Sequence, residues 1–154
     1  MRNAGLGSWP ERHLRSSPHK PALWFEGTTT THGEFAVRVR RAAEALARLG
    51  VQRGDRVAWF GANHPAGLES LYACGQLGAI WVPVNARLTA PEAQYVLEHS
   101  GASLVVHGRE HGTTADTLRW NVHPTNIDDH PERVWDWSYP QFMAVEPAGA
   151  EEQR

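Results

Sequence analysis

The sequence predicts an α/β fold, with a small β-hairpin, then part of a parallel sheet, then a poorly ordered C-terminal tail. Three largely apolar runs, at 56–60, 79–82 and 103–106, have the length and character of buried strands. Two segments with helix-start and helix-end signals separate these runs. Because strand, helix, strand, helix and strand follow one another at these lengths, we expect a right-handed parallel βαβαβ unit.

The N-terminal elements come before this unit. Residues 7–16 predict a short helix that ends at Ser17-Pro18. Residues 21–26 predict a strand, and Gly27 with the threonines at 28–31 predicts a turn into a second short strand. A hairpin is the simplest arrangement of the two.

Residues 33–49 predict the longest helix. Thr31 and Glu34 have the spacing of a capping box, and Gly50 is a natural helix end. Steps of four, three, four and three residues place the apolar side chains on one stripe, which consists of Phe35, Val39, Ala42, Leu46 and Leu49.

A turn at 51–55 leads into the first parallel strand at 56–60. The next helix has Asn63 as its predicted N-cap and Pro65 in its first turn, and it ends near Gly78. Its predicted apolar stripe consists of Leu68, Leu71, Tyr72 and Gly75.

The second helix of the unit starts at another capping box, formed by Thr89 and Glu92, and ends at Gly101. It lies between the strands at 79–82 and 103–106. Its predicted apolar side consists of Tyr95, Val96 and Leu97.

The composition excludes several classes of function. A net charge of -2 and a pI near 6.5 argue against nucleic acid or an anionic membrane as the main partner. A single cysteine, Cys74, excludes an intramolecular disulfide. The sequence has neither a signal-peptide core at its start nor an apolar run of about 20 residues that could span a membrane. We therefore expect a cytoplasmic protein.

A change of composition near His107 predicts a boundary between residues 1–107 and 108–154. The first part carries 11 Lys and Arg against 8 Asp and Glu, whereas the second carries 4 against 9. Leu, Ile, Val and Phe fall from 24 of 107 residues to 6 of 47, a fraction at which a packed core is doubtful. We expect an acidic, largely irregular tail from residue 108.

An ordered set of short motifs runs through the first part. It consists of Pro21-Ala22-Leu23, Thr31-His32-Gly33-Glu34-Phe35, Gly54-Asp55-Arg56-Val57, Asn63, Gly78-Ala79 and Pro83-x-Asn85. In this order, residues 7–106 resemble the N-terminal region of AMP-forming acyl-CoA synthetases, closest to the fatty-acid and medium-chain ligases. His32 stands where that family usually has tyrosine. From about His107 the chain is also expected to depart from the family, in which more core strands and helices would follow.

The resemblance implies a reaction in which a carboxylic acid and Mg-ATP give an acyl adenylate, which coenzyme A then converts to a thioester. The family holds ATP with a Thr/Ser/Gly-rich loop ending in Pro-Lys-Gly, a Tyr-Gly-x-Thr-Glu segment and a later aspartate, and a C-terminal lysine assists adenylation. The sequence contains none of these. The nearest match, Gly112-Thr113-Thr114, is followed by Asp116, and no lysine follows Lys20. A phosphate loop needs free backbone N–H groups and a cation.

No catalytic, cofactor-binding or metal-binding residue is therefore assigned. The first hypothesis is a truncated acyl-CoA synthetase, from a shortened gene or a change of reading frame, that binds no ATP, Mg²⁺ or coenzyme A itself and is inactive alone. The alternative is a non-catalytic module that pairs with the remainder of a ligase or with a full-length homologue. An incomplete parallel sheet leaves an exposed edge that invites such a partner.

Other candidate sites have a simpler structural interpretation. Gly61 and Gly67 do not complete a dinucleotide fingerprint, so a structural turn is favoured. Cys74 is predicted to be a small buried residue, because a reactive thiolate would need a nearby cation or a helix N-terminus. A zinc site is disfavoured for the set His107, His111, His123, Asp128, Asp129 and His130, because no cysteine joins it and the tail is irregular.

Two further groups remain. A basic group could attract the phosphates of coenzyme A but is better explained as the solvated face of a helix; it consists of Arg38, Arg40, Arg41, Arg48 and Arg53. An aromatic group is predicted to pack the sheet against its helices rather than to line an acyl pocket; it consists of Trp24, Trp59, Trp81 and Tyr95.

Overall fold

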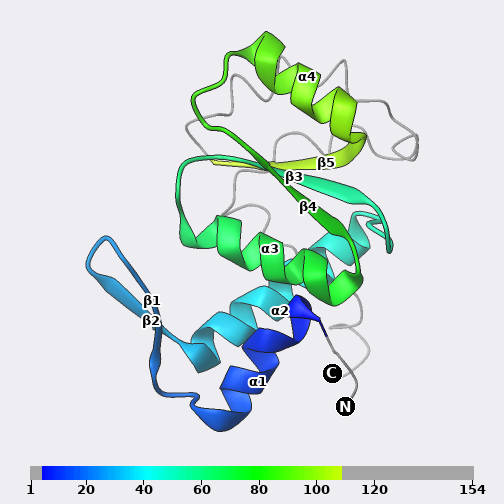
Figure 1. Cartoon of the computed structure of the whole chain (residues 1–154). Helices are drawn as coiled ribbons and strands as arrows, with labels where there is room; N and C mark the ends of the chain where they lie inside the picture. Colours follow the sequence, from blue (N-terminus) through cyan, green and yellow to red (C-terminus); the bar gives the residue numbers. More distant parts are fainter. Residues whose placement is uncertain (1–4, 109–154) are drawn as a thin grey trace, which may run out of the picture.

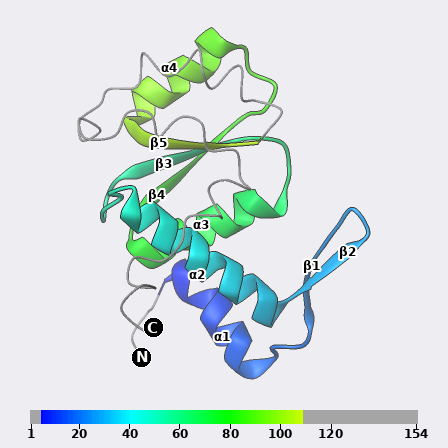
Figure 2. The same cartoon turned by 180° about the vertical axis from the view of Figure 1, so that it is seen from behind.

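The computed structural model describes residues 5–108, which form two layers of helix around a small parallel sheet, with a hairpin beside them (Figures 1 and 2). The elements in chain order are the 3₁₀ helix η1 (Leu6–Ser8), α1 (Trp9–Ser16), β1 (Pro21–Phe25), β2 (Thr28–Thr31), α2 (His32–Arg48), β3 (Arg56–Phe60), α3 (Pro65–Leu77), β4 (Ile80–Val84), α4 (Ala90–Ser100) and β5 (Ala102–His107). The predicted α/β fold is confirmed.

The predicted hairpin is present. β1 and β2 pair antiparallel, with a register irregularity between Pro21 and Leu23. The hairpin stands to one side of the sheet, and β2 runs directly into α2 (Figure 1). α1 packs along α2 on the side away from the sheet (Figure 2).

The parallel sheet has the strand order β4-β3-β5, so β3 is its central strand. The chain moves from β3 to one side through α3, and then returns past β3 to the other side through α4. Since both crossovers of such a unit are right-handed, this reversal places α3 and α4 on opposite faces. Figure 1 shows this arrangement, with α4 above the sheet and α3 and α2 below it.

Side-chain caps and glycines set the helix ends as predicted. The Thr31 and Glu34 capping box starts α2, and the Thr31 N–H donates to Glu34 Oε2 at 2.8 Å. In the second box the Thr89 N–H and hydroxyl both donate to Glu92 Oε2 at 2.8 Å. Gly78 and Gly101 end α3 and α4 in the left-handed conformation that glycine adopts without strain.

The core lies on both faces of β3. Val57, Ala58, Trp59 and Phe60 are all buried, as expected for the central strand of a parallel sheet. α2 contributes a buried stripe that includes Val39 and Leu46 but is rich in alanine, which lets the helix approach its neighbours closely.

Two sequence predictions about the helices are wrong, and a third is correct only in part. The N-cap of α3 is His64, not Asn63. The buried face of α3 is also not the predicted stripe, because Leu68 is 40% exposed and the buried residues are Ala66, Gly67, Glu69, Ser70, Ala73 and Cys74. Small side chains lie inside because α3 is packed between α2 and the sheet. On α4, Leu97 is buried as predicted, together with Ala93, but Tyr95 is 66% exposed.

Candidate functional site

The strand order creates a crevice at one edge of the sheet. The loop after β3 turns toward α3 on one face, and the loop after β4 turns toward α4 on the other face. The carboxyl ends of two neighbouring parallel strands therefore diverge between β3 and β4. In open α/β sheets, ligands bind in the crevice at this point.

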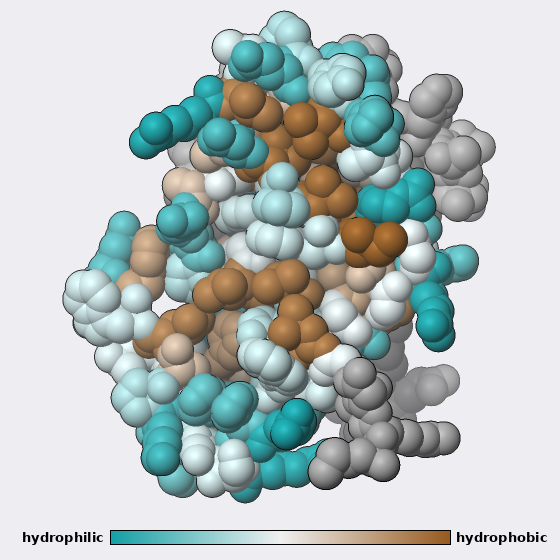
Figure 3. Space-filling model, viewed as in Figure 1, coloured by the Kyte–Doolittle hydropathy of each residue, from teal (hydrophilic) through white to brown (hydrophobic). Residues whose placement is uncertain are grey.

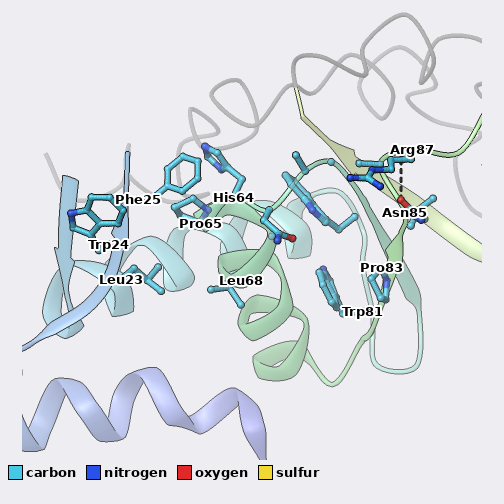
Figure 4. A pocket seen from close by; sticks show the side chains of 17 residues that line it. Leu23, Trp24, Phe25, His64, Pro65, Leu68, Trp81, Pro83, Asn85 and Arg87 are labelled. Atoms are coloured by element: carbon cyan, nitrogen blue, oxygen red, sulfur yellow. Dashed lines mark hydrogen bonds between the residues drawn. The ribbon is translucent and has the colours of Figure 1, made fainter. Parts of the chain in front are cut away.

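An open cleft of about 820 Å³ occupies this position. Its walls come from β1 of the hairpin, the first turns of α3, the ends of β3 and β4, and the two loops that follow those strands. Figure 4 shows the hairpin residues at one end of the cleft and Arg87 and Asn85 at the other. The volume lies within the range of small-molecule sites.

Trp59 packs one wall of the cleft because two glycines leave room for its indole. The side chain is only 6% exposed. A Cβ atom at Gly61 would lie 2.5 Å from Trp59 Cζ2, and one at Gly67 would lie 3.0 Å from Trp59 Nε1. The two glycines therefore belong to a close packing contact with an aromatic ring, which agrees with the structural interpretation of Gly61 and Gly67.

Trp81 forms a second aromatic part of the wall, from β4. Its indole N–H donates to Ser70 Oγ at 3.0 Å, and the Ser70 hydroxyl donates to the Gly67 carbonyl at 2.8 Å. Ser70 is buried, so this chain of hydrogen bonds satisfies its polar atom and fixes the ring against α3.

His64 lies where the hairpin meets α3. Its Nδ1 accepts the N–H of Ala66 at 3.1 Å, which makes it the N-cap of the helix, and Pro65 follows in the first turn. The ring of Phe25 from β1 meets the His64 ring edge-on, with 4.9 Å between centroids. This contact joins the tip of α3 to the hairpin at the mouth of the cleft (Figure 4).

Arg87 supplies positive charge at the opposite end. The Arg87 backbone N–H donates to Asn85 Oδ1 at 2.9 Å, which stabilises the turn after β4. Both side chains line the cleft, and both residues are exposed. A guanidinium next to aromatic walls suits an anionic ligand that has a planar group.

An ion pair with a buried carboxylate supports the α3 wall from behind. Arg38 of α2 donates to both carboxylate oxygens of Glu69, from Nε at 2.5 Å and from Nη2 at 3.4 Å. Glu69 is 0% exposed. Burial raises the pKa of this carboxyl, and the bond from Arg38 only partly opposes that rise.

The other sequence candidates lie outside the cleft or have a structural role. Cys74 is buried, and burial raises the pKa of its thiol to about 12, so the interpretation as a small buried residue is confirmed. In the basic group, Arg38 pairs with Glu69 and Arg40 pairs with Glu11. The solvated-face interpretation is therefore correct only in part.

The prediction for the aromatic group is also correct only in part. Trp59 packs inside, as predicted, and Trp81 is half-buried, but Trp24 is 73% exposed and Tyr95 is also exposed. The prediction is wrong for the last two because the hairpin stands clear of the sheet and Tyr95 faces away from it.

The metal candidates fall mostly beyond the part of the chain that the structure describes. His111, His123, Asp128, Asp129 and His130 lie outside it, as do Gly112 to Asp116 of the phosphate-loop candidate. His107 is buried at the end of β5, with its Nδ1 2.9 Å from the Gly108 carbonyl oxygen. Among residues 5–108, no three His, Cys, Asp or Glu side chains converge as metal ligands.

Within residues 5–108, every helix is too short or too polar to span a lipid bilayer.

The cleft was not predicted from the sequence. Its polar residues all follow a predicted strand, and a place after the carboxyl end of a strand could have identified them; they are Asn63, His64, Asn85 and Arg87. The hairpin side of the cleft had no such signal, because it depends on how the hairpin sits beside the sheet.

Comparison with known proteins identifies the family. The profile described as "AMP-binding enzyme" matches residues 10–148. The match continues well past His107, so the likeness is not limited to residues 7–106. The expectation that the sequence departs from the family at His107 is therefore wrong. The domain boundary there stays a prediction.

Two relatives show the range of similarity. A feruloyl-CoA synthase of Amycolatopsis sp is 52% identical over 118 residues, which are 77% of this chain and 24% of that protein. The long-chain-fatty-acid–CoA ligase FadD13 of Mycobacterium tuberculosis is 34% identical over 140 residues, which are 89% of this chain and 26% of that protein. The chain thus spans about a quarter of the length of the curated relatives that it matches.

Solved structures agree. A fatty acyl CoA synthetase of Mycobacterium tuberculosis superposes with a TM-score of 0.78 and 27% identity, over 94% of this chain and 29% of that one. The N-terminal domain of FACL13 from the same organism superposes with a TM-score of 0.76 and 27% identity, over 96% and 38% of the two chains. The chain therefore belongs to the AMP-binding enzyme family, as a fragment related to acyl-CoA synthetases and fatty-acid–CoA ligases.

Proposed function

We propose that the chain is the N-terminal portion of an AMP-forming acid–CoA ligase, and that its cleft receives part of one of the reaction's anionic substrates. The position of the cleft, at the carboxyl ends of β3 and β4 where the winding reverses, is the observation that carries this proposal. The family uses ATP, and the carboxylic acid and coenzyme A of an acid–CoA ligase are also anionic.

Arg87 is the residue that we propose to contact the substrate's charged group. It is the arginine that lines the cleft in the described residues, and its side chain is exposed there. Phosphate and carboxylate groups both accept paired hydrogen bonds from a guanidinium. Trp81 and Phe25 would provide flat apolar surface farther along the cleft.

An aromatic carboxylic acid is the proposed acyl substrate. Its support is the identity to two ligases of aromatic acids, 52% to the feruloyl-CoA synthase and 38% to an indoleacetate–CoA ligase of Aromatoleum aromaticum. The identity to the long-chain-fatty-acid ligase is 34%.

We further propose that the chain alone does not catalyse adenylation. The sequence offers no Pro-Lys-Gly phosphate loop, and Lys20 is its one lysine. Positioned phosphate donors and magnesium supply most of the catalysis in such reactions. The chain would then act only together with the remaining parts of a ligase.

The test is ATP–pyrophosphate exchange by the purified chain with ferulate and, separately, with a long-chain fatty acid. The expected result is no exchange above a protein-free control. Exchange that survives repurification and matches the chain's elution profile would contradict the proposal.

A second candidate is a non-catalytic module that pairs with the rest of a ligase, and the two outer strands favour it. Pro83 lacks a backbone N–H, which suits β4 to a sheet edge. β5 contains no proline, and within residues 5–108 it pairs only with β3. Size-exclusion chromatography of the chain with a ligase fragment tests this candidate, and a folded chain that elutes as a monomer from every mixture would contradict it.

A further inference from the structure

Two histidines stack where the first helix meets the second. His13 lies in the last turn of α1, and His32 is the first residue of α2. Their ring centroids are 4.6 Å apart, and the rings are nearly parallel at 19°. This stacked pair is a direct side-chain contact between the two helices.

The surroundings of His32 are unfavourable to added positive charge. Partial burial, and after it the nearby His13 and Lys20, lower the pKa of His32 from its ordinary value of 6.5. The first turn of α2 is also the positive end of that helix. The nearby carboxylates are occupied elsewhere, since Glu11 pairs with Arg40 and Glu34 accepts from Thr31.

The chain between α1 and β1 is held at the same place. The His32 N–H donates to the Lys20 carbonyl at 3.0 Å, and the Gly33 N–H donates to the Pro18 carbonyl at 2.9 Å. Movement of His32 away from His13 would therefore also loosen the connection to the hairpin.

A small cavity of about 160 Å³ lies behind the pair and connects it to the cleft wall. Both histidines line it, together with Phe35 and the titratable Tyr72. Leu23 of β1 and Leu68 of α3 line both this cavity and the cleft. These two leucines thus form a partition between the stacked pair and the cleft.

We propose that the His13–His32 stack is a pH-sensitive contact. It holds α1 and the hairpin against α2 at neutral pH and releases them as the pH falls through the histidine range. Neutral rings stack without charge, whereas two imidazolium rings repel each other. Since the hairpin supplies one wall of the cleft, release changes the shape of the cleft. This inference concerns the fold of residues 9–35 and does not depend on the proposed function.

The sign of the effect follows from proton linkage. Because the folded chain holds the pKa of His32 below its ordinary value, the unfolded chain takes up this proton at a higher pH than the folded chain does. The folded state therefore loses stability as the pH falls through the ordinary histidine range.

The experiment compares urea unfolding of the whole chain and of two variants, His32→Gln and His13→Gln, at pH 7.5 and 5.0. Lowering the pH should raise the unfolding equilibrium constant of the wild type by about fivefold more than that of either variant, as for two unit charges about 4 Å apart in water. The double variant should behave like His32→Gln, because the repulsion needs both rings. His13→Gln should keep the part of the pH dependence that burial and Lys20 give to His32. His99→Gln, on α4, is the matched control and should behave like the wild type.

Hydrogen exchange locates the change. At pH 5.0, after correction for intrinsic rates, peptides from α1 and the start of α2 should exchange faster in the wild type than in His13→Gln, while peptides from α4 should not differ. The proposal is overturned if the wild type and both variants show the same pH dependence. Equal protection of α1 in the wild type and His13→Gln at pH 5.0 would overturn it as well.

Discussion

At the scale of single residues, the clearest conflict between burial and charge is at Glu69. The carboxyl is fully buried between α2 and α3, and Arg38 donates hydrogen bonds to it. Burial of a charged group costs more than an ion pair recovers in many proteins. The raised pKa of Glu69 indicates that this balance holds here.

This balance predicts that Glu69 gives the wild type an unusual pH dependence of stability, which Glu69→Gln removes. Because its pKa lies above the ordinary carboxyl value of 4.5, Glu69 binds a proton more readily in the folded chain than in the unfolded chain. Its contribution to stability therefore falls as the pH rises from 4.5 through the raised pKa. Urea unfolding at pH 4.0, 5.5 and 7.0 should show this loss in the wild type and not in the variant. Glu44→Gln, on the exposed face of α2, is the control, and parallel pH curves for the wild type and Glu69→Gln would refute the prediction.

At the scale of elements, the local signals in the sequence specify where helices start and end. Thr31, Glu34, Thr89 and Glu92 could be assigned to capping boxes from spacing alone, because the interaction spans only three residues. The buried face of α3 could not be predicted in this way. Glycine, alanine and serine face inward there because neighbouring elements approach closely, which hydrophobicity does not report.

The capping boxes give a prediction at this scale. Thr31→Ala and Thr89→Ala should each lower the free energy of unfolding by about 1 kcal/mol at pH 7. The bonds to Thr31 and Thr89 lower the pKa of Glu34 and Glu92, so the stability that these carboxylates add is present above pH 4.5 and lost as the pH falls through the lowered values. Thermal unfolding at pH 7 and pH 3 measures both effects. Ser16→Ala, at the exposed end of α1, should be nearly neutral, and the same small effect for all three variants would argue against the caps.

The contact between η1 and α3 gives another prediction. A Cβ at Gly75 would lie 2.9 Å from the Gly7 backbone, and one at Gly7 would lie 2.3 Å from the Gly75 backbone. Neither partner is a flexible side chain, so Gly75→Ala should destabilise the chain by about 1 to 3 kcal/mol although alanine favours helix. Chemical denaturation beside the neighbouring variant Gln76→Ala measures this difference. Unchanged or increased stability of Gly75→Ala would show that η1 can move away without cost.

At the scale of the whole molecule, the order of strands and helices was predictable, and the cleft was not. The βαβαβ unit follows from the alternation of apolar runs and capped helices along the chain. The cleft needs the hairpin to stand beside the ends of β3 and β4, which are far from it in sequence (Figure 4). No local sequence pattern specifies where the hairpin lies relative to these strand ends.

The surface of the molecule has exposed apolar patches. Figure 3 shows apolar side chains gathered over α3 and, above it, between α4 and the sheet. Trp24, Leu68 and Ile80 are among the large exposed apolar residues. Such patches are typical of surfaces that other protein covers. This observation supports the proposal that the chain acts with the remaining parts of a ligase.

The central claim is that these residues form a working part of an acid–CoA ligase, and a chimera tests it most directly. The matching 118 residues of the Amycolatopsis feruloyl-CoA synthase would be replaced by those of this chain, and the measurement is the rate of feruloyl-CoA formation from ferulate, ATP and coenzyme A. The proposal predicts an active chimera that loses at least about tenfold in kcat/KM on Arg87→Ala, which corresponds to about 1.4 kcal/mol, and little on Arg41→Ala. A folded, soluble chimera without activity, or one indifferent to Arg87→Ala, would contradict it.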